Sequence, residues 1–155
     1  MFKFGKKMVI SAPVSGKLKK LEMVQDDVFS GKMLGEGFAI EPTEDAIYAP
    51  CPEGQIVSVF PTKHAISLLA KDGKEILIHI GLDTVELKGQ GFDILVSAGD
   101  FVTKETLLAK VNFSELAKCG KITDVIVVYT NLEANHKLKI AEKIIVTAKE
   151  HIGKI

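Results

Sequence analysis

The stretch that decides the fold, residues 60–81, reads FPTKHAISLLAKDGKEILIHIG. Asp72 and Gly73 lie between two runs of apolar residues, and an Asp-Gly pair in that setting is the strongest short-range signal for a β-hairpin. The second run alternates like a strand with one buried face, because every second residue is an isoleucine: Ile76, Ile78 and Ile80. The stretch therefore predicts two antiparallel strands that pack one face against a hydrophobic core.

The same hairpin predicts that two histidines meet. A two-residue turn would pair Ile66 with His79 and His64 with Gly81. Residues two apart on a strand share a face, so both imidazoles would lie on the face opposite the isoleucines, about 7–8 Å apart at the backbone. A turn with an odd number of residues would instead place the two histidines on opposite faces.

Adjacent imidazoles suit phosphoryl transfer. A neutral imidazole is nucleophilic near neutral pH, and its charge is adjustable there. Phosphoryl transfer has a loose transition state, so the protein mainly positions donor and acceptor and stabilises the phosphoryl oxygens. The chain contains no arginine, so the second histidine and the hydroxyl of Thr62 are the expected hydrogen-bond donors. One histidine would accept the group while a backbone carbonyl holds its other ring nitrogen as the N–H donor.

Other interpretations of the histidines stay open. They could share a face by coincidence, or they could be two ligands of a metal ion. Zinc sites take three or four protein ligands, and the sequence shows no HxH or HxxE pattern and no obvious third ligand nearby. A zinc hydrolase and a pure protein-binding module are therefore the competing functions. The remaining histidines, His136 and His151, lie in polar surroundings and are assigned no role.

The rest of the chain predicts an all-β fold, an antiparallel sandwich or barrel with short helical turns. Short Val- and Ile-rich segments separated by turn residues are typical of such folds. The expected strands cover residues 7–11, 17–23, 35–42, 45–49 and 55–60. Two short helices are expected: one covers residues 113–119 and is stopped by Gly120, and the other begins near Asn131 as N-cap.

Residues 10–18 weakly resemble residues 47–56. Both segments read as a strand, an Ala-Pro pair, a turn with glycine and a second strand, which predicts a duplicated hairpin motif inside one fold. The chain of 155 residues is long enough to bury one core. We therefore expect a single domain over residues 1–155, with a short flexible segment at residues 1–8.

Composition narrows the function further. The formal net charge is zero, which argues against a nucleic-acid binder because such proteins usually carry a basic stripe. Cys51 and Cys119 lie far apart and outside any metal-ligand pattern, which is typical of free thiols in a reducing compartment. The sequence has no apolar run of about 20 residues and no signal-peptide core near its start. These features predict a cytoplasmic protein.

The sequence is similar to a known family at the residues already singled out. Residues 78–92, IHIGLDTVELKGQGF, resemble the signature of the glucose-family IIA components of the bacterial phosphoenolpyruvate-dependent sugar phosphotransferase system. Residues 62–65, TKHA, and residues 35–42, GEGFAIEP, resemble two further elements of that family. The similarity runs from about residue 9 to residue 148.

The resemblance implies a phosphotransferase component with an antiparallel β-sandwich fold. His79 matches the phosphoryl-accepting histidine, His64 the supporting histidine and Thr62 the hydroxyl beside it. The implied donor is the phosphorylated carrier HPr, and the implied acceptor is the IIB domain of a membrane sugar permease of the glucose type. No cofactor or metal is implied.

The resemblance also implies a docking face for these partners. Its apolar positions match Val28, Phe29, Met33, Leu34, Phe60, Leu77 and Val85, and its acidic fringe matches Asp26, Asp83 and Glu133. Apolar contacts give affinity, while acids steer a basic partner. Asp27 stands where the family often has an apolar residue, so the face is expected to be more acidic here. With only about eight residues before the first strand, at most peripheral membrane contact is expected.

Overall fold

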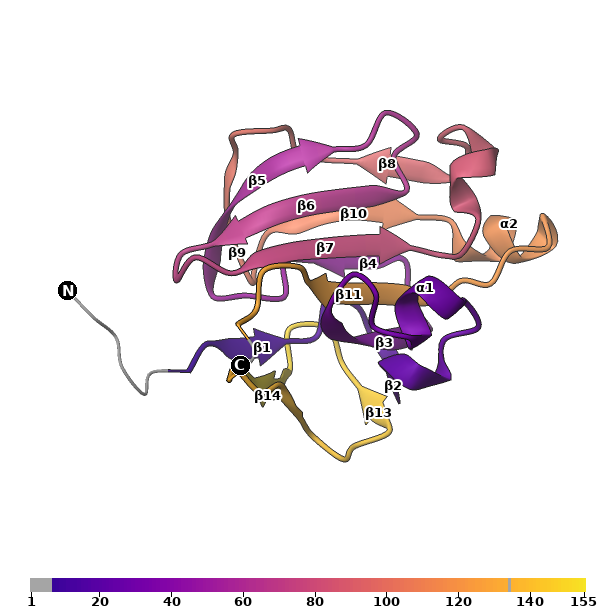
Figure 1. The fold of residues 1–155 in the computed structure, drawn as a ribbon. Helices are drawn as coiled ribbons and strands as arrows, with labels where there is room; N and C mark the ends of the chain where they lie inside the picture. Colours follow the sequence, from indigo (N-terminus) through magenta and orange to yellow (C-terminus); the bar gives the residue numbers. More distant parts are fainter. Residues whose placement is uncertain (1–6, 134) are drawn as a thin grey trace.

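The computed structural model describes residues 7–133 and 135–155, and its strands form three antiparallel sheets (Figure 1). The largest sheet has the order β13 (Ile145–Val146), β2 (Gly16–Lys20), β3 (Glu36–Pro42), β11 (Val125–Tyr129), β7 (Glu75–Ile80), β6 (Ala65–Ala70), β5 (Glu53–Val59) and β9 (Phe101–Thr103). A second sheet has the order β4 (Ala46–Tyr48), β10 (Leu107–Val111) and β8 (Phe92–Ile94), and a third has β1 (Val9–Ser11), β14 (His151–Lys154) and β12 (Lys139–Ile140). The prediction of an all-β antiparallel fold is confirmed.

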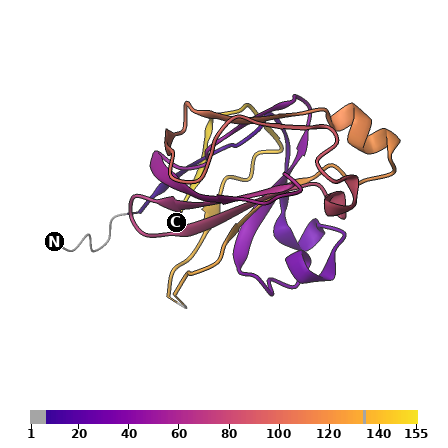
Figure 2. The same ribbon diagram turned by 90° about the horizontal axis from the view of Figure 1, so that it is seen from above.

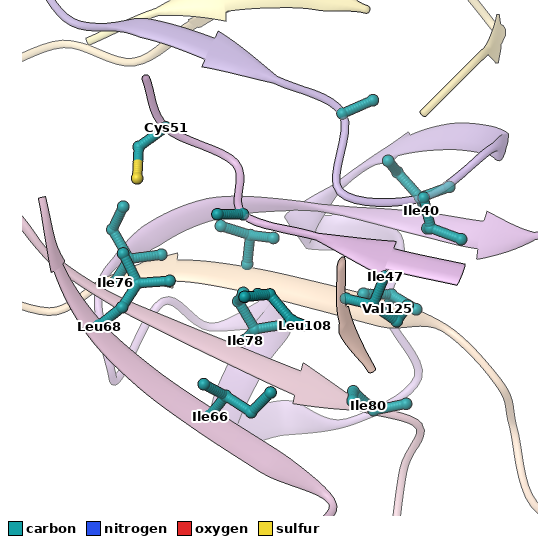
Figure 3. Close-up of a cluster of buried hydrophobic side chains, with 14 of the residues drawn as sticks. Ile40, Ile47, Cys51, Ile66, Leu68, Ile76, Ile78, Ile80, Leu108 and Val125 are labelled. Atoms are coloured by element: carbon teal, nitrogen blue, oxygen red, sulfur yellow. The ribbon is translucent and has the colours of Figure 1, made fainter. Parts of the chain in front are cut away.

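The main core lies between the large sheet and the sheet of β4, β10 and β8. The expected isoleucine stripe of β7 points into it, and each of its members is at most 1% exposed. Figure 3 shows these side chains meeting Leu108 of β10 and Ile47 of β4. The stripe therefore sets which face of β7 is left for other uses, because successive residues of a strand point to opposite faces.

A smaller core lies on the opposite face of the large sheet, over β3 and β11. The chain leaves β2 through the 3-10 turn η1 (Leu21–Met23) and the short helix α1 (Asp27–Ser30), and returns to the sheet as β3. Figure 2 shows this indigo segment on one side of the strands, away from the orange helix α2 (Phe113–Lys118). Its buried side chains pack on β3 and β11; the cluster consists of Leu21, Val24, Phe29, Ala39, Leu82, Ile126 and Val128. The outer surfaces of β7, β6 and β5 lie beyond this cover.

The predicted register of the β6–β7 hairpin is wrong by one residue. His79 pairs with Ala65, and Ile66 pairs with Ile78. The turn has three residues, 71–73, because the amide of Ala70 donates to the carbonyl of Lys74 at 2.9 Å. The carboxylate of Asp72 accepts a hydrogen bond from the amide of Lys74 at 3.2 Å and so supports the wider turn.

The weak internal repeat corresponds to a real structural relation. The amide of Tyr48 donates to the carbonyl of Pro13 at 2.7 Å, and the amide of Ser11 donates to the carbonyl of Pro50 at 3.3 Å. Ser11 and Tyr48 occupy matching positions in the two segments, as do the two prolines. The two Ala-Pro segments therefore lie side by side and exchange equivalent hydrogen bonds. Neither is a hairpin, as was expected, because β1 and β2 belong to different sheets, and so do β4 and β5.

The helix prediction is right at one place and wrong at another. Helix α2 covers the expected residues, with the side chain of Asn112 capping it. The expected helix at Asn131 is absent: residues 131–133 and 135–138 are not helical. The side-chain amide of Asn131 instead accepts from the amide of Glu75 at 2.8 Å and donates to the carbonyl of Gly73 at 2.9 Å, so it binds the hairpin turn rather than capping a helix.

The sequence did not predict helix α1. It is one turn long, and the carboxylate of Asp26 caps it by accepting hydrogen bonds from the amides of Val28 and Phe29. The expected flexible segment at residues 1–8 lies mostly outside the described residues, and the single domain stays a prediction. Among the described residues, no helix is both long and apolar enough to span a bilayer.

Candidate functional site

His79 lies at the end of β7 on the face opposite the isoleucine stripe. Its side chain is half-buried. Ile126 of β11 and Ala65 of β6 flank it in the sheet. The ring of Phe29, from α1, packs on it with a centroid distance of 5.0 Å. The sheet and the helix thus fix the ring on two sides while part of it still faces outward.

His64 reaches the same place from outside the strand. It directly precedes β6, and Lys63 before it has a left-handed backbone with φ of 63°. The strict alternation of a strand therefore does not set the direction of its side chain. The His64 and His79 ring centroids lie 5.0 Å apart at an interplanar angle of 78°. The histidines are adjacent despite the odd-numbered turn, which was expected to separate them.

His64 is also well held. Only 7% of it is exposed, and the ring of Phe60 packs edge-on against it at 5.5 Å. Its backbone carbonyl accepts a hydrogen bond from the amide of Ile80 at 2.7 Å. This bond joins the start of β6 to the end of β7 and keeps the two imidazoles together.

One nitrogen of each imidazole has a partner. Nδ1 of His79 lies 2.8 Å from the carbonyl oxygen of Gly81. A carbonyl only accepts, so Nδ1 carries the proton and Nε2 keeps a free lone pair. Nδ1 of His64 lies 2.7 Å from the hydroxyl of Thr62. The hydroxyl of Thr62 was expected to be a donor for the phosphoryl group. In the structure it is hydrogen-bonded to the ring of His64 instead.

Both imidazoles are biased towards the neutral form. Burial lowers the pKa of His64 below its usual 6.5. Burial also lowers the pKa of His79, and a charge on neighbouring His64 would lower it further. The hydrogen bond to Gly81 and the carboxylates of Asp26 and Asp83 oppose that shift. A neutral His79 at pH 7 is the form that can attack as a nucleophile.

The residues expected at the docking face divide into two groups. Five are exposed on the surface: Val28, Met33, Leu34, Phe60 and Val85. Phe29 is only 6% exposed and packs against His79 instead. Leu77 is half-buried and lies two residues before His79 on the same face of β7. Of the exposed residues, Phe60 contacts the imidazoles directly, through His64.

The three expected acids are not equivalent. Asp26 caps α1, Asp83 is exposed, and both lie close enough to raise the pKa of His79. Glu133 is exposed as well, but it follows Asn131, which is bound to the turn at the other end of β7. Four residues of β7 separate that end from His79, about 13 Å. The structure therefore brings two of the three acids to the imidazoles.

The sequence did not single out Gly81, although a backbone carbonyl was expected to hold one ring. Gly81 has a φ of 76°, in the left-handed region that favours glycine. The only feature of the sequence that could have indicated its role is its position two residues after His79.

A metal site needs several ligand side chains close together. Residues 7–133 and 135–155 contain no group of three or more His, Cys, Asp or Glu side chains placed to hold an ion.

The sequence of the chain matches a known protein family. Residues 8–135 match the family model of the phosphoenolpyruvate-dependent sugar phosphotransferase system, EIIA 1. A PTS system glucose-specific EIIA component of Staphylococcus aureus is 42% identical over 138 residues, which cover 89% of this chain and 82% of the relative. One of Bacillus cereus is 43% identical over 130 residues, covering 84% and 78%.

A solved structure agrees. Glucose permease IIA from Mycoplasma capricolum superposes with a TM-score of 0.88 at 37% identity, covering 99% of each chain. The family model spans the two histidines and most of the large sheet. The chain therefore belongs to the EIIA 1 family of the phosphoenolpyruvate-dependent sugar phosphotransferase system and is a phosphotransferase component of that system.

Proposed function

We propose that His79 accepts a phosphoryl group from phosphorylated HPr and passes it to the IIB domain of a glucose-type sugar permease. The observation that carries this proposal is the hydrogen bond from Nδ1 of His79 to the carbonyl of Gly81, with the ring of His64 alongside. That bond leaves Nε2 as the nucleophile on a ring that is neutral at pH 7.

The chemical step needs no added base. The Nε2 lone pair of His79 attacks the phosphorus carried by a histidine of HPr, and a new N–P bond forms as the old one breaks. The proton of His79 stays on Nδ1, bound to Gly81, and the departing imidazole of HPr recovers its lone pair. The transfer to IIB repeats the exchange with His79 as the donor. Because the transition state is loose, alignment of donor and acceptor contributes most of the rate.

His64 would stabilise the transferred group. If the hydroxyl of Thr62 donates to Nδ1 of His64, the proton of that imidazole is on Nε2 and can bind a phosphoryl oxygen. The ring is held by Phe60 and by its own backbone, so this donor is in place before the partner arrives. A preorganised donor costs little reorganisation during transfer.

The surface around the imidazoles suits a protein partner. Exposed apolar side chains lie on the neighbouring chain segments: Met33 follows α1 and Val85 follows β7, and they are 74% and 49% exposed. Asp26 and Asp83 add negative charge near His79, which favours a partner with a basic surface.

The names of the relatives support glucose as the sugar of the system. We place the protein in the cytoplasm, where HPr and phosphoenolpyruvate would meet it.

A reconstituted relay tests this function. Phosphoenolpyruvate, enzyme I, HPr and the IIB domain of a glucose permease are mixed with or without this chain, and phosphate on IIB is measured. We expect transfer to IIB only when the chain is present. His79→Gln should abolish it, while His136→Gln, which changes an exposed histidine, should not. Transfer by the His79→Gln variant would contradict the proposal.

A further inference from the structure

Thr84 is fully buried beside the site, although its side chain is polar. It opens the 3-10 turn η2 (Thr84–Leu87). Its hydroxyl donates to the carbonyl of Ile80 at 2.5 Å. Its methyl group packs on Gly81, since a Cβ added to that glycine would lie 2.5 Å from Cγ2 of Thr84. Thr84 therefore contacts both residues of the Ile80–Gly81 peptide, which directly follows His79.

The carbonyl of Ile80 needs this donor because of how β6 begins. Ile80 donates its amide to the carbonyl of His64 at 2.7 Å. A pair of this kind in an antiparallel sheet normally exchanges two hydrogen bonds. Here the chain turns at Lys63, just before His64, and the bond to the carbonyl of Ile80 comes from Thr84 instead. A buried carbonyl left without a donor would be costly.

The carbonyl of Gly81 belongs to the next peptide, between Gly81 and Leu82, so its direction depends on the backbone of Gly81. The amide of Gly81 donates to the carbonyl of Asp124 at 2.8 Å, and the amide of Leu82 donates to the carbonyl of Ile122 at 2.9 Å. Gly81 itself has no side chain to restrict its backbone, and glycine accepts many conformations. These two bonds and the hydrogen bond from the hydroxyl of Thr84 to the carbonyl of Ile80 together hold the backbone of Gly81, whose carbonyl binds Nδ1 of His79.

We propose that Thr84 is a positioning residue that keeps the proton of His79 on Nδ1 by fixing the Ile80–Gly81 peptide. The inference rests on the proposed function, in which Nε2 of His79 is the nucleophile. Loss of the Thr84 hydroxyl leaves the buried carbonyl of Ile80 without its donor, so the Ile80–Gly81 peptide tilts about its remaining bond to Asp124 and the carbonyl of Gly81 shifts with it. The proton of His79 then moves between the two ring nitrogens, and the fraction of rings with a free Nε2 lone pair falls.

Nitrogen NMR of the imidazoles in the unphosphorylated protein tests this directly. In the parent protein at pH 8, His79 should show one tautomer, with the proton on Nδ1. In Thr84→Val, which keeps the shape but loses the hydroxyl, we expect a mixture of tautomers. The rate of phosphoryl transfer from phosphorylated HPr should fall about 10- to 100-fold, the size expected for a small misplacement of reacting groups. KM for HPr should not change.

Two further variants make the test specific. Thr84→Ser keeps the hydroxyl and should restore the single tautomer and the rate. Thr106→Val removes a hydroxyl that accepts from the amide of Thr103 near β9, far from the histidines, and should change neither. A single Nδ1–H tautomer and the parent rate in Thr84→Val would overturn the inference.

The outcome remains decisive if the valine variant does not fold. A folded Thr84→Ser protein with mixed tautomers would overturn the inference by itself, and a single tautomer there would support it. If the parent protein takes no phosphate from HPr, the proposed function fails, while the comparison of tautomers still decides the role of Thr84.

Discussion

The carbonyl oxygen of Gly81 lies 2.8 Å from Nδ1 of His79, two residues earlier in the same chain segment. The tautomer of the nucleophile is therefore set by its own backbone and not by the neighbouring imidazole. This separates the roles of the two histidines: His79 can attack without His64, whereas the stabilisation of the transferred group depends on His64.

That separation predicts different effects for the two glutamine variants. His64→Gln should still accept phosphate from HPr, because His79 keeps its bond to Gly81. Its onward transfer to IIB should slow about 100-fold or more, the usual cost of losing one preorganised donor. Single-turnover transfer from the phosphorylated variant to IIB measures this. Onward transfer at the parent rate would remove His64 from the mechanism.

The lowered pKa values of the histidines predict a pH-dependent stability. Burial lowers both values in the folded protein, while the unfolded chain keeps values of about 6.5. Below that pH the unfolded state binds more protons, so the free energy of unfolding decreases as pH falls through 6.5 towards the folded-state values.

Urea unfolding at several pH values between about 7.5 and 5.5 measures this effect. The double variant His64→Gln/His79→Gln lacks both groups and should lose less stability over that range than the parent protein. An equal loss in the two proteins would show that burial of the histidines does not produce the effect.

The exposed apolar residues predict a docking effect that leaves the chemistry intact. Met33→Asp replaces an apolar side chain that is 74% exposed near α1 with a charged one. We expect KM for phosphorylated HPr to rise about tenfold with little change in kcat, because the contact contributes affinity but does not touch the reacting atoms. Phe101→Asp is the matched control, since this residue is 83% exposed but lies on β9 at the edge of the sheet. Equal effects of the two variants would argue against a local docking face.

The hydrogen bonds of Asn131 predict a purely structural effect. Asn131→Ala removes two bonds to the hairpin turn, at Gly73 and Glu75. The free energy of unfolding should fall by about 1–2 kcal/mol, with phosphoryl acceptance by His79 unchanged. Asn135→Ala, at an exposed position in the same loop, is the control. Denaturant unfolding measures both variants. Equal free energies of unfolding for the two would contradict this account.

Regular features of the sequence predicted much of the fold. The isoleucine alternation located the buried face of β7, and the glycines and proline around residues 35–42 bounded β3 at Glu36–Pro42. Helix α2 was predicted over residues 113–119 with Gly120 as its stop, and it covers Phe113–Lys118. These elements depend on neighbouring residues in sequence, so local patterns are enough to find them.

Features that depend on tertiary contacts were missed. The Asp-Gly pair indicated a hairpin but not the size of its turn, which the side chain of Asp72 and the neighbouring Asn131 support. Lysine rarely adopts a left-handed backbone, so the turn at Lys63 that brings His64 to His79 had no sequence signal. The pair of histidines was therefore predicted correctly from a register that is wrong.

The measurement that tests the central claim most directly is the intact mass of the protein after exposure to phosphorylated HPr. We expect a mass increase of one phosphoryl group that is lost in acid, as a phosphohistidine requires. The increase should be absent from His79→Gln and present in His64→Gln. An acid-stable adduct, or an adduct on His79→Gln, would contradict the account.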